Sequence, residues 1–256
     1  MIRMGAAFCV MAGSVMADAP NEAPRPEPRP DLTVTAPSQA TEAPDDSEPV
    51  EVTIGQRDLL VLPADGYAAC LADLDRLGVV YTQTDPIIPD DDRDCGIVQP
   101  VTVTEIVAGV AVTPAAVLRC PTAVAFATWT TDFVLPAVQR LDDRGALTVI
   151  ENGSGYICRR RNGDGSGKLS EHAFGNAVDI MGFQFDEGPR IAVQPREAEG
   201  SMAEAFQDAV RAAACLEFST VLGPGSNAAH DDHLHLDIVA RSSGYRLCEQ
   251  GGGDPD

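Results

Sequence analysis

Short stretches of this chain have the hydrophobic pattern of β-strands. Polar and apolar residues alternate from residue 233 to 239, and residues two apart in a strand share a face. Other runs are apolar and rich in branched side chains, a composition that favours strands over helices. The sequence predicts strands at residues 101–112 (one or two), 147–150, 178–181, 218–222 and 233–239.

Two helices are predicted in the first half of the chain. The first covers residues 65–77, with Asp65 as its cap and Gly78 as its stop. Pro121 opens a longer second helix, in which Pro136 predicts a kink. Apolar residues recur every four positions along this second helix and predict a buried stripe: Trp129, Phe133, Ala137 and Leu141.

A third helix is predicted after Ser201, which forms a capping box with Glu204. Its apolar face is expected to contain Phe206, Ala209, Val210 and Ala213. The elements follow the order α, β, α, then strands interrupted by a helix. This order predicts an α+β fold, a single domain in which helices flank a small antiparallel sheet.

The ends of the chain differ in composition from this predicted domain. Residues 1–17 combine Arg3, an apolar run and small residues before Ala17, which predicts a cleaved signal peptide. Residues 18–55 contain eight prolines among acidic and small residues, which predicts a disordered linker. We therefore expect the domain at residues 56–250, a disordered tail at 251–256, and no transmembrane segment in the mature chain.

The cysteines point to an oxidising compartment. Cys9 lies in the predicted signal peptide, and an even set of six remains, which predicts three disulfides in a secreted or periplasmic protein. The sequence does not choose among the fifteen pairings that six cysteines allow. As a working expectation we pair them sequentially, as Cys70–Cys95, Cys120–Cys158 and Cys215–Cys248.

The charge of the chain excludes one class of partner. It contains 18 basic and 39 acidic residues, a net charge of −21. Binding to nucleic acid is not expected, because neutralising phosphates requires basic patches. The one dense basic cluster is Arg159, Arg160 and Arg161.

The histidines carry the clearest chemical signal. All four, His172, His230, His233 and His235, lie in or beside residues 170–179 and 231–237. Two histidines and one carboxylate form a zinc set that leaves a position for water. We predict that His172, Asp179 and His235 bind Zn²⁺.

The same residues resemble a known group of enzymes. The pattern S-x-H-x-x-G-x-A-x-D, followed by H-x-H, resembles the LAS group of zinc peptidases, above all murein endopeptidases and D,D-dipeptidases. The wider context, from about Cys70 to Cys248, is similar to the bacterial extensin-like C-terminal domain family. The resemblance implies a periplasmic zinc peptidase or amidase that acts on peptidoglycan stem peptides or cross-links.

The resemblance also assigns roles, some of which stay open. His233 is the favoured base or oxyanion partner, and Asp232 is the alternative, because D,D-dipeptidases have a glutamate at this position. Arg159 would bind a substrate carboxylate or the developing oxyanion, as an arginine does in related enzymes. Asp237 or Asp231 would hold a histidine N–H. The competing functions are a non-catalytic module that binds cell wall and keeps the zinc, and a purely structural zinc site.

Overall fold

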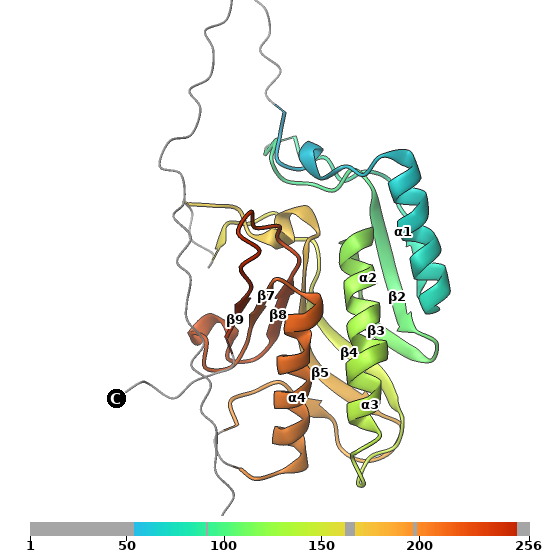
Figure 1. Ribbon diagram of the computed structural model, residues 1–256, viewed down its shortest axis with the longest axis vertical. Coiled ribbons are helices and arrows are strands. Elements are labelled where there is room, and N and C mark those ends of the chain that lie inside the picture. Colours follow the sequence, from blue (N-terminus) through green and yellow to red (C-terminus); the bar gives the residue numbers. More distant parts are fainter. Residues whose placement is uncertain (1–53, 91, 162–166, 197–198, 250–256) are drawn as a thin grey trace, which may run out of the picture. The chain divides into compact units, whose positions relative to one another are not determined.

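The computed structural model describes residues 54–90, 92–161, 167–196 and 199–249 (Figure 1). The predicted signal peptide, the predicted tail and nearly all of the predicted linker lie outside these ranges. Within the described ranges, no helix combines the length and the apolar character needed to cross a membrane.

The domain is built on one sheet of nine strands in the order β1-β2-β3-β4-β5-β8-β7-β9, with β6 paired to β5. The β3–β4 and β7–β9 pairs are parallel and the other pairs are antiparallel. The strands are β1 (Val80–Gln83), β2 (Pro100–Val107), β3 (Val110–Arg119), β4 (Leu147–Ser154), β5 (Ala177–Phe185), β6 (Ile191–Ala192), β7 (Thr220–Leu222), β8 (Leu234–Asp237) and β9 (Leu247–Cys248).

The predicted fold class is therefore right in outline and wrong in detail. The chain forms a mixed α/β domain, but its sheet is large and mixed instead of small and antiparallel. Two causes explain the difference. The strands β6 and β9 have two residues each, too few to show any periodicity. The segment between β3 and β4 is a helical crossover, the connection that parallel strands require.

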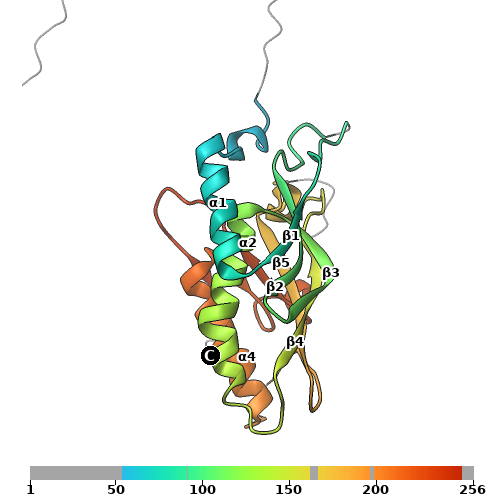
Figure 2. The ribbon, with the colours of Figure 1, turned by 90° about the vertical axis from the view of Figure 1, so that its right-hand side faces the viewer.

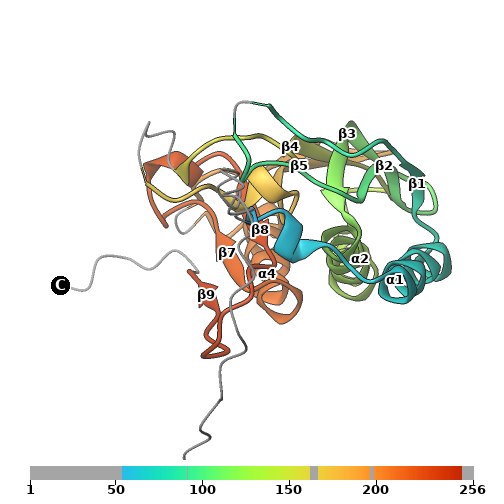
Figure 3. The same ribbon diagram turned by 90° about the horizontal axis from the view of Figure 1, so that it is seen from above.

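The helices gather on one face of the sheet (Figures 2 and 3). The first, α1 (Ala64–Leu77), ends at Gly78 as predicted, because the left-handed φ of 75° suits a residue without Cβ. The prediction of Asp65 as the cap was wrong, because Pro63 occupies the cap position. Asp65 lies in the first turn, where its negative charge interacts favourably with the helix dipole.

The predicted long second helix is interrupted. It consists of α2 (Cys120–Trp129), one π-helical stretch (Thr130–Val134) and α3 (Leu135–Val138). Pro136 therefore follows the π stretch by two residues. An irregular turn of this kind is one of the usual ways in which a helix accommodates proline.

The third predicted helix is α4 (Met202–Glu217), and its cap is confirmed because Ser201 Oγ accepts a hydrogen bond from Glu204 N at 3.1 Å. Ala209, expected on the apolar face, is exposed. The buried residues of the helix are Phe206, Gln207, Val210, Arg211 and Ala214.

Trp129 is fully buried in the apolar core, as the sequence predicts. Leu141 of the predicted stripe is also buried, whereas Phe133 and Ala137 are only partly buried. The ring of Trp129 lies 6.4 Å from that of Phe183 on β5 and 6.5 Å from that of Phe218 after α4. Its indole Nε1 donates to Val210 O at 2.9 Å, which satisfies the one polar atom of a fully buried side chain. Trp129 thus joins α2, α4 and the middle of the sheet.

Three disulfides join the six cysteines of the domain, and only Cys215–Cys248 follows the predicted pairing. The other two bonds are Cys70–Cys120, between α1 and the start of α2, and Cys95–Cys158. Sequential pairing was wrong because the β2–β3 hairpin returns the chain to α1. Cys120 therefore meets Cys70, and Cys95 pairs with a residue beyond β4.

Candidate metal centre

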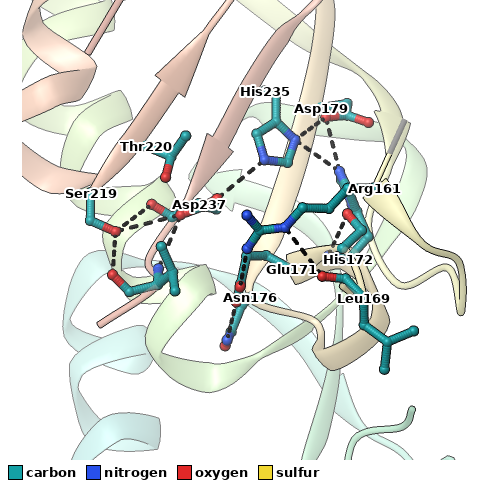
Figure 4. A network of polar contacts seen from close by, with 12 residues as sticks. Arg161, Leu169, Glu171, His172, Asn176, Asp179, Ser219, Thr220, His235 and Asp237 are labelled. Carbon is teal, nitrogen blue, oxygen red and sulfur yellow. Dashed lines mark hydrogen bonds and ion pairs between the residues drawn. The ribbon is translucent and has the colours of Figure 1, made fainter. Parts of the chain in front are cut away.

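Three side-chain atoms of buried residues meet at one point of the sheet (Figure 4). His172 Nε2 lies 3.1 Å from Asp179 Oδ1 and 3.0 Å from His235 Nδ1. The remaining side of this triangle, from His235 Nδ1 to Asp179 Oδ1, measures 3.0 Å. The structure thus brings together all three residues that the sequence assigns to zinc.

Local structure fixes where each of the three residues lies. His172 belongs to a short 3₁₀ turn (Glu171–Phe174), whose cap Ser170 accepts a hydrogen bond from His172 N at 3.4 Å. Gly175 ends the turn with a φ of 67°, and a Cβ there would lie 2.3 Å from Ile97 Cδ1. Strand β5 then begins, and its residue Asp179 is the direct partner of His235 on β8.

Each histidine turns the correct nitrogen toward the cluster because its other nitrogen is engaged. His172 Nδ1 is 2.7 Å from Gly155 O, an acceptor, so Nδ1 carries the proton and Nε2 offers its lone pair. His235 Nε2 faces Asp237 Oδ2 at 3.3 Å, which leaves Nδ1 for the cluster. Asp237 therefore has the supporting role that the sequence left open between Asp237 and Asp231.

The supporting carboxylate is itself held in place. Asp237 Oδ1 accepts a hydrogen bond from Val239 N at 3.0 Å and lies 3.5 Å from Ser219 Oγ. The second oxygen of Asp179 accepts a short hydrogen bond from Ser154 Oγ. Ser154 is a residue that sequence reasoning missed. Its only signal in the sequence is its position between two glycines, four residues beyond the strand predicted at 147–150.

Charge in the cluster favours a cation. Burial alone would raise the pKa of Asp179, but hydrogen bonds with His172 and His235 outweigh it and hold the pKa well below the usual range. Burial would lower the pKa of His235, whereas hydrogen bonds to Asp179 and Asp237 raise it to about 9. Positive charge at this point is thus stabilised by two ionised carboxylates.

His233 lies at the edge of the cluster and is hydrogen-bonded to its neighbour. Its Nδ1 is 2.8 Å from Asp232 Oδ1, and its Nε2 points inward, 3.7 Å from Asp179 Oδ1. The exposed side-chain fraction is 15% for His233 and 76% for Asp232. Of the two candidate bases, His233 is therefore the one beside the cluster, and Asp232 orients it from outside.

A cavity of about 120 Å³ opens beside the cluster, and Arg159, His230 and His235 are among its lining residues. Among the described residues, the guanidinium of Arg159 makes one long hydrogen bond, to Arg160 O at 3.5 Å, and its other N–H groups are open to a ligand there. Burial and the neighbouring His235 and His233 lower the pKa of His230 to about 4, so this imidazole is neutral near pH 7.

His230 is a second residue whose place the sequence did not predict. Its ring centroid lies 5.2 Å from that of His233 and 5.7 Å from that of His235. Its Nδ1 is 2.8 Å from Asn227 Oδ1, an oxygen that also accepts from Ala229 N. Its signal in the sequence was the clustering of all four histidines.

The dimensions of the cluster fit a metal ion. Ligand atoms in a tetrahedral zinc site with bonds of about 2.0–2.1 Å are separated by roughly 3.3 Å. The three sides of the triangle, 3.1, 3.0 and 3.0 Å, are close to this value. A second group, Asp92 with Cys95 and Cys158, also has metal-ligating residue types, but its two sulfurs form a disulfide and are not thiolates.

Comparisons with known proteins give one match. The family described as "Extensin-like protein C-terminus" matches residues 68–249. A search of curated proteins finds no match to this chain. A search of solved structures finds none either.

Proposed function

The chain belongs to the extensin-like protein C-terminus family, and from that premise we propose that it is a zinc-dependent peptidase or amidase acting on peptidoglycan stem peptides or cross-links. One observation carries the proposal. Three ligand atoms form a triangle with sides of 3.1, 3.0 and 3.0 Å, and the imidazole of His233 stands beside it. Metal ligands with an adjacent proton carrier are the parts that hydrolysis of an amide needs.

His172, Asp179 and His235 would hold the ion. A zinc ion bound there would act as a Lewis acid, lowering the pKa of water and polarising the carbonyl of the bond to be cleaved. Among the described residues three ligands converge instead of four, which favours a catalytic site over a structural one, because a structural zinc site is usually closed by a fourth protein ligand.

The remaining residues divide the work on the substrate. His233 takes a proton from the attacking water through Nε2 and returns it to the leaving amine, while Asp232 holds the opposite nitrogen at 2.8 Å. Arg159 binds a carboxylate of the substrate or the negative charge that develops on the carbonyl oxygen. His230, neutral near pH 7, offers a hydrogen-bond partner in the same cavity.

Peptidoglycan as the substrate rests on the resemblance of the motifs to LAS peptidases and on the compartment. Three disulfides favour an extracellular or periplasmic location, where the cell wall lies. The strongly acidic chain disfavours nucleic acid as a partner. Peptide bonds between amino acids of the wall are therefore the substrate class that the site and the location favour together.

Digestion of purified sacculi tests the proposal. The zinc-loaded protein is incubated with sacculi, and released muropeptides are separated and identified by mass, alongside the His172→Ala variant. We expect products from the wild type and none from the variant. Wild-type protein that pellets with sacculi but releases nothing, at any zinc concentration and pH tried, would instead identify a wall-binding module.

A further inference from the structure

Two short segments that follow Cys158 are joined by an isolated β-bridge, and their side chains line two different cavities. Arg161 N donates to Lys168 O and Ser170 N donates to Arg159 O, both at 3.0 Å. Between these bonds, Arg160 pairs with Leu169. Because side chains alternate along a strand, Arg159 and Ser170 line the metal cavity, whereas Arg160 and Leu169 line a separate groove. We call residues 159–161 and 168–170 the basic hairpin.

This groove is larger and more open than the metal cavity, with a volume of about 330 Å³ against about 120 Å³. Three cations and two carboxylates line it. Lys168 is the only lysine in a sequence of 256 residues whose net charge is −21. The lining residues are Gln56, Asp94, Arg160, Arg161, Lys168, Leu169, Glu171 and Phe174.

The charges left free in the groove are mainly positive. Glu171 forms an ion pair with Arg161 at 3.4 Å, whereas Asp94 Oδ1 accepts a hydrogen bond from Gln56 N at 3.1 Å and keeps its charge. Two positive charges, on Arg160 and Lys168, and one negative charge are therefore left without an ion pair among the described residues. Arg160 donates to Gly167 O and forms no ion pair within the described ranges. The ammonium of Lys168 has no hydrogen bond or ion pair to any described residue. A ligand that binds this surface is therefore stabilised most if it carries a negative charge.

The groove is a built feature that connects to the metal cavity. The Cys95–Cys158 disulfide holds two parts of its lining together, since Asp94 directly precedes one cysteine and Arg160 follows the other by two residues. Arg161 and Glu171 line both the groove and the metal cavity. Glu171 is in turn fixed by Asn176 Nδ2, which donates to its Oε2 at 2.9 Å. One extended peptide could therefore contact both sites.

We propose that the groove is a second substrate subsite, in which Lys168 and Arg160 bind a carboxylate on a residue away from the bond that is cleaved. The inference rests on the proposed peptidase function and adds a substrate class to it, peptides that contain an internal acidic residue. The role differs from that of Arg159, which lies on the other face of the basic hairpin and serves the metal cavity.

Binding of paired peptides tests the subsite without any need for cleavage. Fluorescein-labelled pentapeptides keep a free C-terminal carboxylate and contain one glutamate, or one glutamine, at each internal position in turn. Fluorescence anisotropy with the full chain should show tighter binding of a glutamate peptide than of its glutamine partner. Lys168→Gln and Arg160→Gln should each reduce the affinity for the glutamate peptide roughly two- to five-fold, as expected for loss of an exposed charge pair.

Controls separate the subsite from general charge effects. Lys168→Arg keeps the positive charge and should bind the glutamate peptide about as tightly as the wild type. Lys168→Glu should abolish the preference for glutamate. Arg76→Gln removes the same charge from an exposed arginine of α1 that lines neither cavity, and it should change nothing. Equal affinity for every glutamate and glutamine pair, or a preference that survives in Lys168→Glu, overturns the subsite.

The two proposals fail in different ways. If the wild type digests sacculi but shows no preference for glutamate, the peptidase function stands and the subsite falls. If it binds the glutamate peptide through Lys168 but releases no muropeptides, the groove is a binding site and the peptidase function falls.

Discussion

The two halves of strand β5 support regions of opposite character. Near its C-terminal end, the ring of Phe183 lies 5.0 Å from that of Phe206 and 6.4 Å from that of Trp129, inside the apolar core. Near its N-terminal end, Asp179 lies 3.1 Å from His172 Nε2 and 3.0 Å from His235 Nδ1. One continuous strand thus contributes both to the apolar core and to the candidate metal centre.

The two regions depend on different kinds of interaction. Packing around Phe183 is non-directional and depends on volume, so the loss of stability grows with the number of side-chain atoms that a substitution removes. At Asp179, Ser154 orients one carboxylate oxygen, and the other faces two histidines that are themselves oriented by Gly155 and Asp237. Substitutions around Phe183 should lower the stability of the fold. Substitutions around Asp179 should change metal binding and catalysis.

The largest effect is expected from removing a ligand. His172→Ala should reduce bound zinc from one ion per chain to almost none and abolish hydrolysis, because two remaining ligands form a weak site. Elemental analysis after zinc reconstitution measures this directly. His230→Ala is the matched control and should keep its zinc, since His230 is not among the three converging residues. Full zinc occupancy in His172→Ala would refute the ligand assignment.

The next effect concerns proton transfer. His233→Ala should keep zinc and lower the rate of muropeptide release by roughly 10²–10⁴-fold, the usual loss for an acid–base group. Asp232→Asn should lose less, because Asp232 is exposed and acts through its hydrogen bond to His233 Nδ1. A larger loss in Asp232→Asn than in His233→Ala would reverse the two roles and restore the carboxylate as the base.

In the apolar half, Phe183→Ala should lower the free energy of unfolding by about 3–5 kcal/mol, the usual cost of a cavity left by a buried phenylalanine. Denaturant titration measures the loss. The folded fraction should still bind one zinc per chain, because the ligands lie at the other end of β5. Loss of zinc from folded Phe183→Ala would show that the two regions are not separable.

The smallest effect is expected from the supporting carboxylate. Asp237→Asn keeps the size of the side chain but weakens its interaction with His235 Nε2. Metal affinity should fall by roughly 10–100-fold, as is usual for residues that orient a metal ligand. Competition with a chelator of known zinc affinity reports the change. An unchanged affinity would mean that Asp237 serves folding alone.

Sequence reasoning succeeded where a local pattern decides the structure. Gly78 ends α1 and Ser201 caps α4 because glycine and serine suit those backbone positions in nearly any context. The set His172, Asp179 and His235 was predicted from residue type and from the resemblance to LAS peptidases, because no local pattern shows that β5 and β8 pair.

Features that depend on which distant elements become neighbours were not predictable. Two of three disulfide pairings were wrong because the strand order, not the sequence order, decides which cysteines meet. The sheet was underestimated because its parallel pairs join strands that are far apart in the chain. Ser154 shows the same limit, since a serine between glycines reveals its role only when Asp179 lies beside it.

The Cys95–Cys158 disulfide also affects when the candidate site can take its final geometry. Cys95 packs with Ala173 and Phe174 of the turn that carries His172, and Cys158 directly precedes the basic hairpin. In a reducing compartment this cross-link is absent, and the segment with Arg159 loses one of its links to the turn, although Ile157 N still donates to His172 O at 3.2 Å. Under the proposed peptidase function, this dependence would be a safeguard during biosynthesis. Oxidation would then complete the site in the compartment where the proposed substrate lies.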